Sequence, residues 1–134
     1  MLILILSVIL HLTADFTQTK SVAMMREPQV SQGKMVYRAP DYLKWEYTSP
    51  NAVVWEMNGQ ESNVSPQIQN LLRMIMTSIS GAEESDDKLR RESKKLFRSV
   101  NVIMDEQRKV AQRVELIDKN GDTTIIEFSN VVTR

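Results

Sequence analysis

The 134-residue chain has no cysteine, a single histidine and only four glycines. Without cysteine it can form neither a disulfide nor a thiolate metal site, and it has no cysteine nucleophile and no lipid-modified cysteine. The lone histidine, His11, lies in an apolar run and cannot build a two-histidine metal site. No glycine-rich phosphate loop and no GxSxG or GxGxxG motif occurs. These absences predict a protein that is not an enzyme and that uses no cofactor or metal.

The chain also has no excess of charge, because 17 Lys and Arg balance 17 Asp and Glu. A neutral protein has no overall field to attract nucleic acid, so we expect no nucleic-acid partner. Asp118, Asn120 and Asp122 are spaced like part of a calcium loop, but Phe128 stands where the liganding glutamate would be expected. We interpret this segment as a hairpin turn.

The length and composition predict one folded domain preceded by a short hydrophobic segment. Apolar residues make up 42% and charged residues 25%, as in ordinary globular proteins. Residues 1–12 consist almost entirely of Met, Leu, Ile and Val, yet they are too few to cross a bilayer. They fit a signal sequence in length, and a buried or interfacial first helix is the alternative. Residues 13–134 are the predicted domain.

Alternation of apolar and polar residues predicts two neighbouring strands in the middle of the chain. Residues 43–47 and 53–57 each place apolar side chains on one face, with Trp45 and Trp55 on the same side of a meander. The same reasoning predicts strands within 12–25, 33–37, 100–104, 114–116 and 126–132, with hairpin turns at 58–59 and 118–122.

The period changes at Ser65, a good N-cap, which is followed by Pro66 at the first helical position. Apolar residues then recur at helical spacing until Gly81. The charge-dense stretch 83–98 reads as a second, weaker helix or a surface loop. The order strands, helices, strands predicts an α+β fold, mainly β: a curved antiparallel sheet with helices packed on one side.

The most notable feature of the composition is its content of large apolar residues, with eight methionines and two tryptophans. Methionine is flexible and polarizable, so it suits a cavity whose occupant changes shape, but packed cores collect the same residues. The composition is therefore consistent with two alternatives, an ordinary packed core and a hollow that binds a ligand.

Three segments resemble strands of the periplasmic outer-membrane lipoprotein carriers, the LolA-like family. They are ADFTQTK (14–20), GKMVYRAPDYLKWEYTSP (33–50) and VELIDKNGDTTIIEFSNV (114–131). The resemblance implies an open, curved antiparallel half-barrel with helices covering its concave side, and a hydrophobic hollow for the acyl chains of lipoproteins. Compared with the family pattern the chain looks shortened, so we expect an incomplete domain.

The resemblance also implies which residues form the hollow and its lid. The concave wall would comprise Phe16, Met35, Tyr37, Leu43, Trp45, Tyr47, Val53 and Trp55. The lid would comprise Ile68, Leu71, Leu72, Ile75 and Met76. Arg38 would be the lid contact, although family carriers place this arginine directly before the proline, where this chain has Ala39.

By this resemblance the protein is expected to be a monomeric, non-enzymatic periplasmic carrier. It would take lipoproteins from an inner-membrane release complex and shuttle them to the outer membrane, with an acceptor there as a further partner. Two alternatives stay open: a lipid- or lipoprotein-sensing module without a transport role, and a degraded family fragment.

Overall fold

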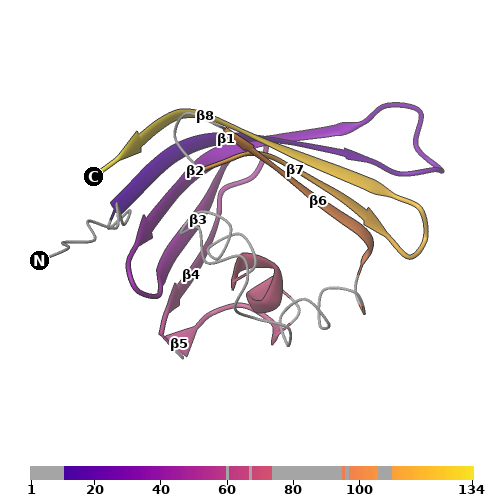
Figure 1. Cartoon of the computed structure of the whole chain (residues 1–134). Helices are drawn as coiled ribbons and strands as arrows, with labels where there is room; N and C mark the ends of the chain where they lie inside the picture. The colour runs from indigo at the N-terminus through magenta and orange to yellow at the C-terminus, as the bar shows by residue number, and fades with distance from the viewer. Residues whose placement is uncertain (1–10, 60, 67, 74–94, 96, 106–109) are drawn as a thin grey trace, which may run out of the picture.

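The computed structural model describes residues 11–59, 61–66, 68–73, 95, 97–105 and 110–134. These residues form one eight-stranded sheet, in the order β5-β4-β3-β2-β1-β8-β7-β6, and every strand pairing is antiparallel (Figure 1). The strands are β1 (His11–Ser21), β2 (Gln29–Arg38), β3 (Tyr42–Ser49), β4 (Val53–Asn58), β5 (Glu61–Ser62), β6 (Phe97–Asp105), β7 (Val110–Asp118) and β8 (Thr123–Thr133).

The sheet consists of two meandering arms that meet at β1. One arm runs from β1 to β5, and the other runs from β6 to β8, which returns to pair with β1. Gly59 follows β4 with a φ of 62°, and Gly121 precedes β8 with a φ of 89°. Both lie at the predicted hairpin turns, where a residue without a Cβ adopts positive φ most easily.

One face of the curved sheet carries the hydrophobic core. The register places Ala14, Met35, Trp45 and Trp55 in one line across β1 to β4, as the predicted meander required. On the other arm, Val114 and Ile126 continue the apolar face. Figure 1 shows the sheet arching over a short helix, so the apolar face is the concave one.

A short helix packs against part of this face, and its described residues are 66 and 68–73. Ser65 caps its start as predicted, since its Oγ accepts a hydrogen bond from the Ile68 amide at 3.5 Å. Leu72 is 1% exposed and packs into the core. The predicted end at Gly81 lies outside the described residues.

The predicted α+β fold, with helices covering the concave side, is wrong. The described residues are 68% strand and 8% helix. Eight strands span roughly 33 Å at the usual spacing, whereas two turns of helix are only about 11 Å long. The predicted second helix at 83–98 lies mostly outside the described residues, and its last two positions, Phe97 and Arg98, belong to β6 instead. The helical spacing of apolar residues correctly predicted where the helix begins. It carries no information on how much of the sheet the helix would leave uncovered.

Candidate functional site

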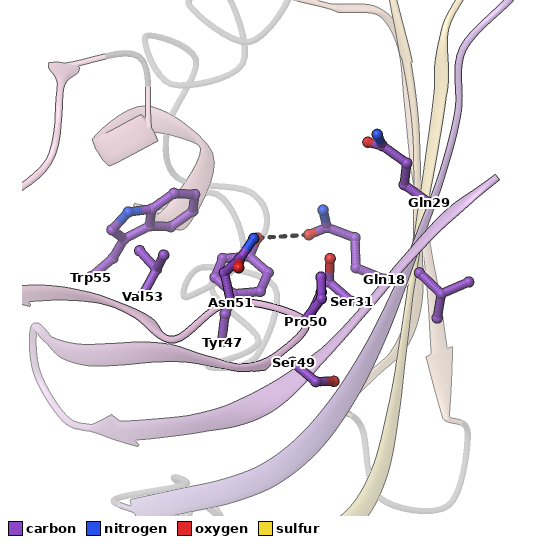
Figure 2. A pocket seen from close by; sticks show the side chains of 10 residues that line it. Gln18, Gln29, Ser31, Tyr47, Ser49, Pro50, Asn51, Val53 and Trp55 are labelled. Carbon is purple, nitrogen blue, oxygen red and sulfur yellow. Dashed lines mark hydrogen bonds between the residues drawn. The ribbon is translucent and has the colours of Figure 1, made fainter. Parts of the chain in front are cut away.

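A cavity of about 520 Å³ opens at one end of the concave face, between β1, β2, β3 and β4 (Figure 2). It lies within the range of about 300–1,000 Å³ that is usual for small-molecule sites. The described residues that line it are Gln18, Gln29, Val30, Ser31, Tyr47, Ser49, Pro50, Asn51, Val53 and Trp55. Half of this set is apolar or aromatic and half is polar, so the cavity offers two kinds of contact.

The cavity lies where large core side chains give way to small polar ones along the strands. Phe16 is paired with Gly33, and its ring stacks on Trp45 with ring centroids 4.1 Å apart. Two residues further along β1 and β2, Gln18 is paired with Ser31. Because Ser31 has a small side chain, the concave face is hollowed past the Phe16 row.

Tyr47 forms the boundary between the packed core and the cavity. Its ring meets Trp55 edge to face at 5.3 Å and Phe16 at 5.4 Å. Its hydroxyl donates a 2.8 Å hydrogen bond to Oε1 of Gln18, drawn as a dashed line in Figure 2. The Trp45 indole N–H is buried and meets no acceptor with hydrogen-bond geometry among the described residues. Tyr47 thus contacts both the aromatic cluster, through its ring, and the polar side chains that line the cavity, through its hydroxyl.

Burial raises the pKa of the Tyr47 hydroxyl above its ordinary value of 10.0, and the neighbouring Trp45 and Gln18 side chains oppose that rise. Because the pKa of Tyr47 is higher in the folded than in the unfolded chain, its protonated hydroxyl contributes stability below the unfolded-state pKa. This contribution is lost as the pH rises through the folded-state pKa. We expect Tyr47→Phe to cost about 1 kcal/mol at neutral pH, through the lost hydrogen bond.

The difference in free energy of unfolding between Tyr47→Phe and the unmodified protein should become smaller above about pH 10. Only the unmodified protein has a hydroxyl there whose ionisation destabilises the fold. Urea unfolding at a series of pH values measures this difference. Stability curves that stay parallel through the alkaline range would contradict the expectation.

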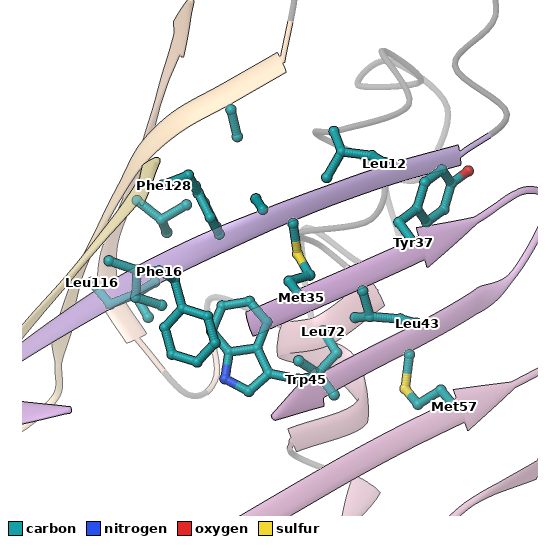
Figure 3. Close-up of a cluster of buried hydrophobic side chains, with 14 residues drawn as sticks. Leu12, Phe16, Met35, Tyr37, Leu43, Trp45, Met57, Leu72, Leu116 and Phe128 are labelled. Atoms are coloured by element: carbon teal, nitrogen blue, oxygen red, sulfur yellow. The ribbon is translucent and has the colours of Figure 1, made fainter. Parts of the chain in front are cut away.

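The predicted wall residues all lie on the concave face, but they divide into two groups. Phe16, Met35, Tyr37, Leu43 and Trp45 are packed together in the core (Figure 3). Each of them is at most 3% exposed. Tyr47, Val53 and Trp55 line the cavity. Their role in binding acyl chains stays a prediction.

The predicted lid residues are only partly described. Leu72 is buried, and Ile68 and Leu71 pack against the core cluster. Ile75 and Met76 lie outside the described residues. Arg38 alternates with Tyr37 along β2, so it lies on the convex face, where its guanidinium carbon is 5.4 Å from the centre of the Tyr42 ring. That placement lends no support to the predicted lid contact.

Sequence reasoning missed the polar part of the cavity. Gln18, Ser31, Ser49 and Asn51 were not predicted because only apolar residues were sought. A usable signal existed for Gln18, since it continues the period-two series of Ala14 and Phe16 onto the same face. The turn residue Asn51 had no such signal.

The described residues also bear on two other kinds of site. No group of three or more His, Asp or Glu side chains there could hold a metal ion. Within the same residues, no helix has the length and apolar character needed to span a bilayer.

The fold and the site define a sheet protein with a curved, apolar inner face and an open cavity at one end of it. Residues 8–67 match the family model described as outer membrane lipoprotein carrier protein LolA. This match covers 60 of the 134 residues and confirms the resemblance to the LolA-like family that was seen in the sequence. The match contains β1 to β5 and every described residue that lines the cavity.

Other comparisons add little to this resemblance. No curated protein matches the chain. Among solved structures, a DUF1329 family protein from Desulfovibrio piger is similar over 93% of this chain and 86% of that chain, with 8% sequence identity and a TM-score of 0.37. We draw no functional argument from that likeness.

Proposed function

We propose that this protein is a periplasmic carrier that binds the acyl chains of lipoproteins at the cavity. It would receive them from an inner-membrane release complex and shuttle them to the outer membrane, without any covalent chemistry. The observation that carries the proposal is the open cavity on the concave face, because all of its described lining residues fall inside the segment that matches the carrier family.

The energy for binding would come from apolar burial. Val30 and Val53 line the cavity and are 50% and 42% exposed, so they present apolar surface that an acyl chain can cover. Each buried methylene contributes about 0.8 kcal/mol, and about ten methylenes would contribute roughly 8 kcal/mol before the cost of association. Such binding is reversible, as a carrier requires.

Binding can be tested with two neighbouring valines of β4. Val53 lines the cavity, whereas Val54 is equally exposed, at 41%, on the opposite face. Val53→Gln is expected to weaken binding of a fluorescent acyl probe roughly fivefold, which corresponds to about 1 kcal/mol of lost apolar contact. Val54→Gln is the matched control and should bind like the unmodified protein. Equal effects of the two substitutions, or no saturable binding at all, would refute an acyl site here.

Binding alone would also suit a sensing module, so transport needs its own test. The carrier proposal predicts that the protein releases a triacylated lipoprotein from inner-membrane vesicles that hold the release complex. The lipoprotein should then elute with the protein as a soluble complex. Saturable probe binding together with a lipoprotein that stays in the vesicles would favour a binding module without a transport role.

A further inference from the structure

The described residues in the polar wall of the cavity carry amides and hydroxyls and no ionic group. Its described polar residues are Gln18, Gln29, Ser31, Tyr47, Ser49 and Asn51. None of the described residues that line the cavity is Asp, Glu, Lys, Arg or His. These residues can therefore donate and accept hydrogen bonds, yet they offer no counter-charge to an ion.

The geometry places this neutral wall beside the apolar one. Tyr47 contributes its ring to the aromatic cluster and its hydroxyl to the bond with Gln18, so it belongs to both walls. Gln18 accepts that bond through Oε1, and its amide group extends into the cavity in Figure 2. An acyl chain against Val53 and Trp55 would bring its head group to these amides and hydroxyls.

The nearest cation along β1 lies outside the cavity. Lys20 is two residues beyond Gln18, is exposed, and is paired with Gln29 across β1 and β2. It does not line the cavity. A charged head group at Gln18 would lose hydration without gaining an ionic partner from the described lining residues, whereas a neutral head group exchanges water for equivalent hydrogen bonds.

We infer that the cavity selects acyl compounds with an uncharged polar head, such as an ester, amide or hydroxyl, over the same chain with an ionic head. This inference rests on the proposed function and narrows its ligand class. The ester and amide groups that join acyl chains to a polypeptide have this chemistry, whereas free fatty acids and long-chain alkyl amines do not.

Three ligands with the same 18-carbon chain test the inference on the full chain. Oleamide is neutral, oleate is its anionic counterpart of nearly the same shape, and oleylamine is cationic. Each competes with a fluorescent acyl probe below the concentration at which it aggregates. Oleamide is expected to bind about tenfold more tightly than either ion, because only the ions lose hydration without compensation.

The outcomes separate this inference from the proposed function. Equal binding of oleamide and oleate, or tighter binding of an ion, would overturn neutral selection while acyl binding stands. Failure of all three ligands and of the probe would overturn the proposed function as well.

A charge placed in the wall provides a second test. Gln18→Glu keeps the acceptor for the Tyr47 hydroxyl, so the fold should persist by circular dichroism. Gln18→Glu is expected to weaken the binding of oleamide and to strengthen the binding of oleylamine, so that oleylamine becomes the tighter ligand of the two. Lys20→Gln is the control outside the cavity and should leave the order of the three ligands unchanged. The inference would be overturned if the order of the ligand affinities were unchanged in Gln18→Glu, or if it changed in Lys20→Gln.

Discussion

Replacing Gly33 with alanine is expected to destabilise the protein by about 3 kcal/mol or more, because the new methyl group has no room. A Cβ at this position would lie 2.5 Å from Cζ of Phe16 and closer still to the carbonyl oxygen of Glu46. The Phe16 ring cannot withdraw easily, since it is 1% exposed and stacked on Trp45. Urea unfolding followed by tryptophan fluorescence measures the loss.

A second glycine separates crowding from backbone strain. Gly121 has a φ of 89°, but a Cβ there would meet nothing within 4 Å. Gly121→Ala is therefore expected to cost only about 1 kcal/mol, through the strained backbone alone. If Gly33→Ala were no more destabilising than Gly121→Ala, the close packing of Phe16 against the β2 backbone would not be a constraint.

The second large effect is expected for Trp45→Ala, at about 3–5 kcal/mol. Trp45 is 1% exposed and contacts Phe16, Tyr47 and Phe128, so it joins β1, β3 and β8 in one cluster. Its removal would leave a large void that rigid strands on both sides cannot close. Chemical unfolding measures the loss.

The partner of Trp45 across β3 and β4 should behave differently. Trp55 is half-buried and lines the cavity. Trp55→Ala is expected to cost less than half as much stability as Trp45→Ala. If acyl chains bind as proposed, it should weaken probe binding roughly tenfold, or about 1.4 kcal/mol. Equal losses of stability in the two variants would mean that the cavity wall is an ordinary part of the core.

Much of the sheet could be predicted from short-range patterns. The alternation around Trp45 and Trp55 gave two strands and their shared face, because the period of a strand is fixed at two residues. The turns at Gly59 and Gly121 were found because positive φ restricts the choice of residue. The pairing of β1 with β8 has no such local signal, since the strands lie about a hundred residues apart in the sequence.

The site was predicted less well, for a reason that lies in the packing. A period-two pattern tells which face a side chain occupies, but it does not tell how densely that face is filled. Leu43 and Val53 both fitted the predicted wall, yet Leu43 is fully buried and Val53 is 42% exposed beside the cavity. The difference arises from neighbours such as Ser31, whose small size matters only once the strands are in register.

The pairing of β1 with β8 also bears on the order in which a newly made chain can fold. The arm from β1 to β5 contains only neighbouring hairpins, so it can assemble while the later residues are still being synthesised. Until β8 arrives, one side of β1 exposes unpaired amide and carbonyl groups along eleven residues, at a core strand rather than at a protected edge. A nascent chain of this design would need a chaperone or fast completion to avoid pairing with its neighbours.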